Sequence, residues 1–231
     1  MIRPNPDNPT SIIGLKPSLG REVCFQVSQQ LFPTVTPQSE QNMIVILTPT
    51  YTFTDLHIDN GQDGLSAPLD ECVKIWFTYP PTEKNLSMMK KVNGQKGKMI
   101  QLAPDLEGGL IFLTTSSEAI YLPAGVIHAV FTKSGGFLVS MDFTTRDSIL
   151  PFSQYIAWNL EVPLDACSQS QVFHLYLGCL DVALSHQRVM KALECWISIE
   201  HHLEGVAKNN SKWQEATGSV WGRFMLMTEA R

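Results

Sequence analysis

The sequence predicts a mainly β protein with helices, in which a barrel of short strands is followed by a C-terminal helical region. Between residues 43 and 143, short runs rich in β-branched and aromatic residues alternate with turn signals such as Asn-Gly and Gly-Gly. Many short strands favour a closed barrel, because closure removes exposed sheet edges. After about residue 145, apolar residues recur at helical spacing instead. With 231 residues and 44% hydrophobic content, the chain can bury one substantial core.

These patterns divide the chain into three parts. Residues 1–42 are expected to be an N-terminal arm with the first elements, because the segment starts rich in Pro, Asn, Ser and Gly. A short strand or helix is expected within it, at residues 20–31. Residues 43–145 are expected to form the barrel core. Residues 146–231 are expected to form a helical region that packs on that core.

Within the core, strands are expected at residues 43–47, 72–79, 109–113 and 136–141. The insert that begins at residue 80 is expected to turn into a short helix through Met88 and Met89. Residues 123–125, Pro-Ala-Gly, predict a tight turn before His128. This pattern is typical of a double-stranded β-helix, the jelly-roll or cupin barrel, whose mouth can hold a small ligand.

The C-terminal region is expected to contain helices at residues 153–160, 171–184 and 188–203. A further apolar stripe runs through Trp213, Ala216, Val220, Phe224 and Met227. We expect these apolar faces to pack on the barrel. The alternative is that part of the stripe is a surface for a partner, or for a second copy of the chain in a homodimer.

A His-x-Asp motif and a distant histidine suggest a metal site. His57 and Asp59 follow an apolar run, and on an extended strand two such residues point to the same face. His128 lies in a strand-like segment after the predicted turn. Two histidines and one carboxylate on one face of the metal are what a non-haem iron(II) oxygenase requires. The sequence therefore predicts His57, Asp59 and His128 as metal ligands.

Lys74 and Thr54 are candidates for binding a co-substrate. On an alternating strand Lys74 shares a face with Trp76 and Thr78, and a lysine that points inward needs a counter-charge. One interpretation is a solvent-facing lysine on an edge strand. The functional interpretation is that Lys74 and the Thr54 hydroxyl hold a carboxylate. Because Thr54 and His57 are three apart, that interpretation requires a bulge or bend between them.

Three segments together resemble a JmjC domain, closest to the branch that contains PHD-finger-associated histone lysine demethylases. They are residues 51–59 (YTFTDLHID), residues 74–77 (KIWF) with the nearby Pro81-Thr82 and Asn85-Leu86, and residues 122–130 (LPAGVIHAV). The resemblance covers about residues 43–145. It implies an enzyme, a 2-oxoglutarate-dependent dioxygenase that uses Fe(II) and O2. It further implies that His57, Asp59 and His128 hold the iron, and that Thr54 and Lys74 bind 2-oxoglutarate.

Several positions depart from that family's pattern. The demethylases carry a tyrosine ten positions beyond the first histidine, where this chain has Ala67. Near the end of the core the family often has Gly-Gly-Asn-Phe, and this chain has Ser-Met-Asp-Phe at residues 140–143. The family also has more structure ahead of its first metal motif, so we expect the arm or a second copy of the chain to supply it. These departures concern the substrate pocket more than the metal site.

Charge and cysteine content restrict the partners. A net charge of −5 argues against direct binding of nucleic acid, which needs a basic face, and fits a basic peptide better. The five scattered cysteines are not in Cys-x-x-Cys pairs, which favours reduced thiols in the nucleus or cytoplasm. No segment resembles a signal peptide or a membrane span. We therefore expect an intracellular protein without a membrane partner.

The leading hypothesis is a JmjC oxygenase that hydroxylates or demethylates N-methyl-lysine in a histone tail or another protein. One alternative is a JmjC-type protein hydroxylase or small-molecule oxygenase, because Ala67 replaces the expected tyrosine. Another is a non-catalytic JmjC-like scaffold that acts through its helical tail. Binding of metal and 2-oxoglutarate distinguishes the oxygenases from the scaffold.

Overall fold

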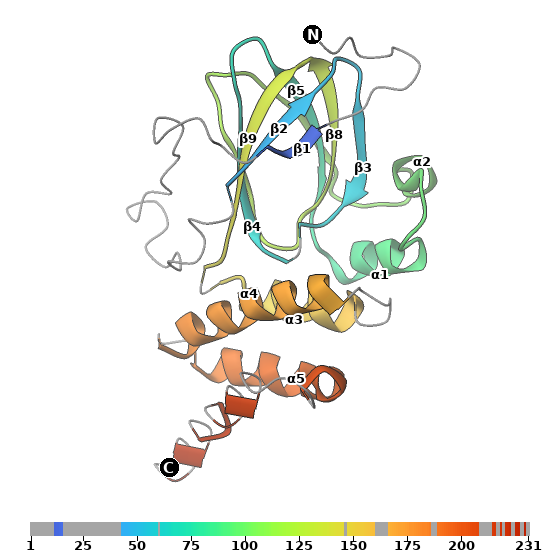
Figure 1. Ribbon diagram of the computed structural model, residues 1–231. Helices are drawn as coiled ribbons and strands as arrows, with labels where there is room; N and C mark the ends of the chain where they lie inside the picture. Colours follow the sequence, from blue (N-terminus) through green and yellow to red (C-terminus); the bar gives the residue numbers. More distant parts are fainter. Residues whose placement is uncertain are drawn as a thin grey trace.

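The computed structural model describes residues 12–15, 43–59, 61–145, 147–159, 166–185 and 189–207, with scattered positions between 214 and 229. Two antiparallel sheets lie next to a set of helices, with the sheets above and the longer helices below in Figure 1. The prediction of a β-rich protein with helices is confirmed.

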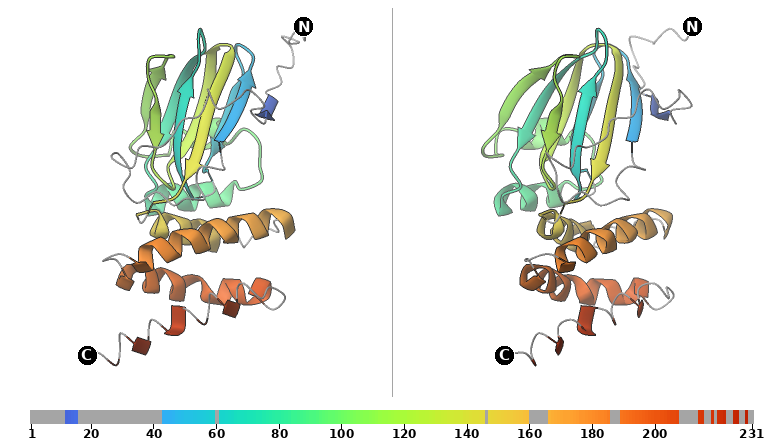
Figure 2. Two further views of the ribbon diagram at one scale, coloured as in Figure 1. Left: turned by 60° about the vertical axis from the view of Figure 1, so that its left-hand side comes forward. Right: turned by 90° about the vertical axis from the view of Figure 1, so that its left-hand side faces the viewer.

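The nine strands of the described chain form two sheets. The five-stranded sheet has the order β1 (Ile12–Leu15), β2 (Met43–Thr48), β9 (Gly136–Phe143), β4 (Asp63–Pro68) and β7 (Ile120–Leu122). The four-stranded sheet has the order β3 (Phe53–His57), β8 (Ile127–Ser134), β5 (Val73–Tyr79) and β6 (Leu110–Thr114). Successive strands mostly alternate between the two sheets, so the chain crosses from one to the other repeatedly (Figure 2).

The strand β1 belongs to the predicted arm. Its residue Ile12 lies opposite Leu47 on β2, so the arm adds an antiparallel strand to the five-stranded sheet. One of the two expected sources of additional structure, the arm itself, therefore contributes. The element expected at residues 20–31 lies outside the described residues.

The inner faces of the sheets are identified by a buried cluster that both sheets supply. Trp76 and Val130 come from the four-stranded sheet, whereas Ile120, Leu122 and Leu138 come from the five-stranded sheet. Members of one cluster that come from two sheets must lie between them. Because side chains alternate along a strand, residues two positions away from these on the same strand also point to the inner face.

Two short helices cover the outer face of the four-stranded sheet. They are α1 (Glu83–Lys91) and α2 (Lys98–Leu102), and they pack through a cluster that includes Leu56, Tyr79 and Met89. The Asp55 carboxylate on β3 accepts hydrogen bonds from the backbone N–H groups of Lys98 (2.8 Å) and Met99 (2.9 Å). The predicted helix through residues 88 and 89 is therefore present.

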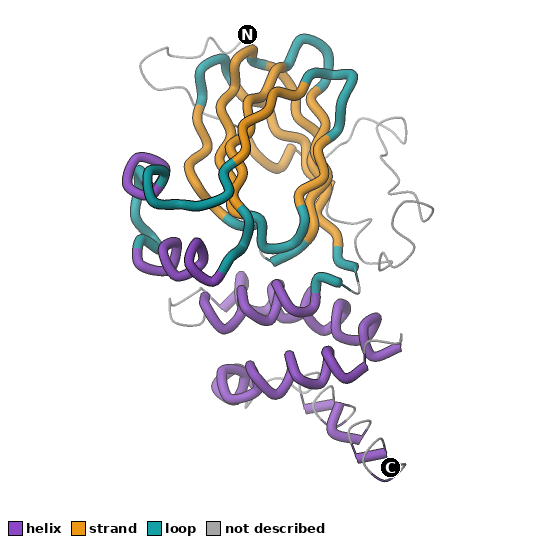
Figure 3. Tube along the Cα trace, turned by 180° about the vertical axis from the view of Figure 1, so that it is seen from behind, coloured by secondary structure: helices purple, strands orange, loops and turns teal. Residues whose placement is uncertain are grey.

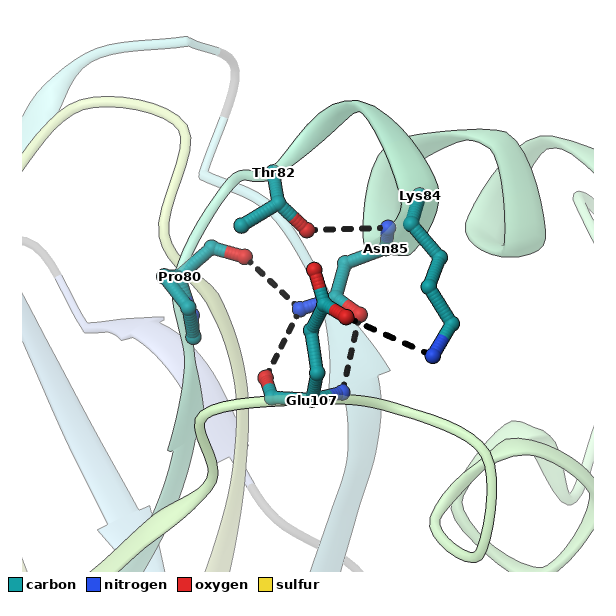
Figure 4. A network of polar contacts seen from close by, with 5 residues as sticks. All are labelled: Pro80, Thr82, Lys84, Asn85 and Glu107. Carbon is teal, nitrogen blue, oxygen red and sulfur yellow. Dashed lines mark hydrogen bonds and ion pairs between the residues drawn. The ribbon is translucent and has the colours of Figure 1, made fainter.

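A buried asparagine fixes the start of α1 (Figure 4). The Asn85 amide donates to the carbonyls of Pro80 (3.0 Å) and Glu107 (2.9 Å), and its oxygen accepts from the Glu107 N–H (3.0 Å). The Thr82 hydroxyl caps the helix by accepting from the Asn85 N–H (3.2 Å). Lys84 and Glu107 add an exposed ion pair at 3.4 Å. These contacts attach α1 to the end of β5.

Three longer helices follow the sheets (Figures 1 and 3). They are α3 (Ile149–Asn159), α4 (Ala166–Ser185) and α5 (Val189–Ala207), and both α3 and α4 begin earlier than the sequence pattern indicates. They share a separate buried core that includes Phe152, Tyr176 and Trp196. The apolar stripe expected from Trp213 to Met227 falls largely outside the described residues. In the part of the chain that is described, no helix has the length and apolar character needed to cross a membrane.

Candidate metal centre

Two histidines and an aspartate meet at one end of the space between the sheets. On the antiparallel pair β3 and β8, His57 lies directly opposite His128. Asp59 follows β3, and its Oδ1 and Oδ2 lie 3.4 Å from the Nε2 atoms of His57 and His128 respectively. The potential ligand atoms of the three residues all lie within 4.8 Å of one another, so they could hold one metal ion.

Local backbone structure delivers these side chains. The register between β3 and β8 shifts between Thr54 and His57, which confirms the predicted irregularity. Before His128, the Val126 N–H donates to the Pro123 carbonyl (3.1 Å) and Gly125 has φ +83, so the expected tight turn is present. Glycine suits this turn because it adopts positive φ without steric cost.

Hydrogen bonds to backbone carbonyls fix the orientation of both imidazole rings. His57 Nδ1 lies 2.8 Å from the Asp55 carbonyl, and His128 Nδ1 lies 3.2 Å from the Val126 carbonyl. A carbonyl oxygen only accepts, so both Nδ1 atoms carry the proton and donate it. When a ring is neutral, its Nε2 therefore keeps the lone pair, the arrangement that metal-binding histidines use.

The charges of the cluster also suit a cation. Burial lowers the pKa of His128 to about 4, despite the opposing effect of Asp59. Burial would raise the pKa of Asp59, but its hydrogen bond with His57 and the two histidines lower it overall. Burial would lower the pKa of His57, but Asp59 raises it overall. At neutral pH the cluster therefore offers an ionised carboxylate and a neutral His128.

The cluster is open on one side. The exposed fraction of the side chain is 35% for His57 and 31% for Asp59, whereas it is 4% for His128. An ion held by these three groups would therefore keep positions open toward solvent, as catalytic metal sites with three protein ligands do.

Lys74 is buried in the same interior. It is 1% exposed on β5, a central strand, and its ammonium donates to the hydroxyls of Thr48 and of Thr132 (2.8 Å). Burial lowers the pKa of Lys74. Among the described residues no carboxylate forms an ion pair with it. This geometry excludes the solvent-facing alternative, and it leaves the lysine without a carboxylate partner among the residues that the structure describes.

Thr54 is not hydrogen-bonded to Lys74 in the described structure. It lies opposite Val130, which places it on the inner face of β3, but it is exposed. Thr52, two residues earlier, does join the lysine network: it is buried, and its hydroxyl oxygen lies 2.9 Å from that of Thr132. Alternation along β3 and β8 could have identified Thr52 and Thr132 in the sequence.

Ala67 faces away from the cluster. It pairs with Val139 and shares that residue's face of the sheet, which is the opposite face from Leu138. The expectation that residue 67 lines the substrate pocket is therefore not met by the geometry. Because β3 and β4 belong to different sheets, the alternation along β3 does not tell which residues of β4 point inward.

Asp142 is a further inward-facing carboxylate, two residues from the inward Ser140. Ser140 lies 2.9 Å from Ser66 across the inner face of the five-stranded sheet. Burial and the neighbouring Asp59 raise the pKa of Asp142 to about 7. The sequence pattern shows this residue as a departure from Gly-Gly-Asn-Phe, without indicating that it lies beside the cluster.

The fold and the cluster together define a β-rich protein with a candidate metal site. Comparison with curated proteins finds similarity to JmjC domain-containing histone demethylation protein 1 from three yeasts. The chain is 26% identical over 106 residues to the Kluyveromyces lactis protein, 25% over 121 residues to the Debaryomyces hansenii protein and 23% over 121 residues to the Saccharomyces cerevisiae protein. No protein-family model matches the chain.

These similarities support a JmjC-domain protein and confirm the resemblance found in the motifs. They cover 46%, 48% and 49% of this chain. They cover only 22%, 24% and 25% of the relatives, so the match concerns about a quarter of each relative's length.

Proposed function

We propose that this protein is an iron(II)- and 2-oxoglutarate-dependent JmjC oxygenase whose two sheets form a double-stranded β-helix. The observation that carries the proposal is the pairing, within one interior, of a His-Asp-His cluster with a buried lysine that has no carboxylate partner among the described residues. A metal and a dicarboxylate would satisfy both features at once.

The donor set fits iron(II). Two Nε2 atoms and one carboxylate are the ligands of the facial triad, and the exposed side of His57 and Asp59 leaves room for other ligands. Iron(II) bound there would, with 2-oxoglutarate, supply dioxygen activation and oxidation of a substrate C–H bond. The carbonyls that accept from the two Nδ1 atoms would keep both rings in the binding tautomer.

The interior also fits a dicarboxylate. The Lys74 ammonium and its hydroxyl partners Thr48 and Thr132 would receive the carboxylate far from the metal. Thr54 lies on the inner face of β3 and is proposed to assist from there. Trp76 lies between, with its ring centroid 6.2 Å from that of His128, and would exclude water from one wall.

The proposed substrate is an N-methyl-lysine side chain in a histone or another protein. This follows from the names of the three relatives, which are histone demethylation proteins, and it favours a nuclear location. Hydroxylation of an N-methyl carbon would release formaldehyde and the demethylated amine, while 2-oxoglutarate would yield succinate and carbon dioxide.

The test measures succinate formed from 2-oxoglutarate under air with added iron(II), with and without methylated histone peptides. We expect turnover in the wild type and in His201→Ala, an exposed helical control, and none in His57→Ala. Formaldehyde that depends on peptide would support a demethylase. Succinate without formaldehyde would favour a hydroxylase, and failure to bind either manganese(II) or 2-oxoglutarate would overturn the oxygenase in favour of a scaffold.

A further inference from the structure

Asp142 places a second carboxylate beside the candidate metal centre. It lies on β9 in alternation with Leu138, a member of the cluster between the sheets, and therefore on the inner face. The residue directly opposite it on the neighbouring strand β4 is Gly64. Asp142 is partly accessible, so a ligand can reach it.

Gly64 defines a small space between the two carboxylates. A Cβ atom at this position would lie 3.7 Å from Asp59 Oδ2, 4.0 Å from Asp142 Oδ1 and 3.6 Å from Leu122 Cβ. Both carboxylates therefore border the position that a Cβ atom of residue 64 would occupy. Glycine has no Cβ atom and leaves that position free. Leu122 gives the same space an apolar wall.

Asp142 has no role in the cluster itself. The group of ligand atoms within 4.8 Å of one another contains His57, Asp59 and His128 but not Asp142. In the described part of the chain, no ion pair links it to a lysine or arginine. An inward carboxylate without a cationic partner is costly, because burial penalises its charge. A positively charged ligand would remove that cost.

The surroundings favour an organic cation over a second metal ion. A second ion would need several ligands around Asp142, but its inner-face neighbours Gly64 and Leu122 offer none, and the nearby Asp59 carboxylate already faces the two histidines. An alkylammonium group instead needs a carboxylate for its charge and an apolar wall for its carbons. Asp142 and Leu122 supply those two features.

We propose that Asp142 determines specificity for a cationic amine, by accepting the substrate ammonium beside the metal centre. This inference rests on the proposed oxygenase function and assigns its substrate class to one residue. The carbon atoms attached to that nitrogen would then lie next to the cluster. The family pattern often has a neutral asparagine here, whereas this chain has an ionisable carboxylate, that of Asp142.

The experiment measures binding of a charged probe and an uncharged probe, rather than turnover. The charged probe is N-acetyl-Nε,Nε-dimethyl-lysine methylamide, and the uncharged one is its isostere with carbon in place of the ammonium nitrogen. Calorimetry without oxygen uses protein loaded with manganese(II) and 2-oxoglutarate. We expect wild type to bind the charged probe at least about tenfold more tightly than the isostere, as a charge-assisted contact implies.

Variants separate the charge from the shape. Asp142→Asn keeps the size of the side chain but removes its charge. We expect its affinities for the two probes to differ by no more than about twofold, and its affinity for 2-oxoglutarate to equal that of the wild type. Asp142→Glu is expected to retain a preference for the charged probe. Asp70→Asn removes a carboxylate at an exposed position, and we expect it to behave as wild type.

Two results would overturn the inference while the proposed function stands. In the first, the wild type binds manganese(II) and 2-oxoglutarate but does not bind the charged probe more tightly than the uncharged one. In the second, Asp142→Asn prefers the charged probe as strongly as the wild type does. Wild type that fails to bind manganese(II) and 2-oxoglutarate would overturn the proposed function and this inference together.

Discussion

His57 and His128 face each other across β3 and β8, with their ring centroids 4.1 Å apart. This cross-strand pair is the basis of the candidate metal centre, because residues far apart in the sequence become neighbours through strand register. Asp59 then completes the cluster from the loop after β3.

We predict that metal affinity falls with decreasing pH through the release of one proton. His57 has a raised pKa, so it is partly protonated near neutral pH, and the metal must displace that proton. Asp59 is already ionised, and His128, with its pKa near 4, is already neutral. Manganese(II) titrations from pH 6 to pH 8 check this. Below the pKa of His57, log affinity should change by about one per pH unit, whereas a slope near zero or near two would contradict it.

Lys74→Met is predicted to weaken 2-oxoglutarate binding without loss of stability. The substitution removes a buried charge that has no carboxylate partner among the described residues, so unfolding free energy should stay within about 1 kcal/mol or increase. Co-substrate affinity should fall at least about tenfold, because a charge-assisted contact is lost. Denaturant unfolding and calorimetry measure the two effects. Lys84→Met, at an exposed lysine, is the control, and it should leave 2-oxoglutarate affinity and the free energy of unfolding close to the wild-type values.

The lowered pKa of Lys74 leads us to predict that stability rises with pH. Its folded pKa is lowered by burial from 10.5, so between the lowered pKa and 10.5 the unfolded chain binds more protons than the native one. Unfolding free energy from this group therefore increases as pH rises through that interval. Lys74→Met should lack this increase in urea unfolding between pH 7 and pH 10, and an unchanged pH profile would contradict the prediction.

Asp63 is predicted to support both stability and metal binding. Its buried carboxylate accepts from the Tyr121 hydroxyl (2.7 Å), the Ala124 N–H (3.1 Å), and the hydroxyls of Thr145 (3.2 Å) and Ser148. These bonds join β4 and β7 to the turn before His128 and to the start of α3.

We expect Asp63→Ala to cost about 3 kcal/mol in unfolding free energy, because several buried donors lose their acceptor. Manganese(II) affinity should fall as well, since the turn that delivers His128 loses an anchor. Asp105→Ala, at an exposed position, should change both by little. Normal stability in Asp63→Ala would show that other contacts hold this turn.

Gly61→Ala is predicted to destabilise the protein more than Gly94→Ala. Both glycines have positive φ, +70 and +74, so both substitutions introduce backbone strain. At Gly61 the added Cβ would also lie 2.9 Å from the Phe152 Cα on α3, whereas at Gly94 nothing lies within 4 Å. Thermal unfolding should show a cost at least about 1 kcal/mol larger for Gly61→Ala. Equal costs would mean that α3 moves away without penalty.

Much of the candidate site could be predicted from local pattern. Strand alternation placed Lys74 and Trp76 on one face, and the spacing of Thr54 and His57 required the register shift that β3 shows. Both inferences depend on neighbours within a few residues, where the period of two is reliable. The resemblance to JmjC domains then grouped three distant motifs.

The sequence by itself determined the strand runs, the helix through residues 88 and 89, and the residue types of the candidate metal site. Only the tertiary structure decided which residues face that site. Ala67 turned outward, whereas Thr52 joined the lysine network and Asp142 faced the cluster. The physical reason is that a loop between strands resets the alternation, and cross-strand register then selects the inner face. Sequence spacing carries the period within a strand but not the register between strands.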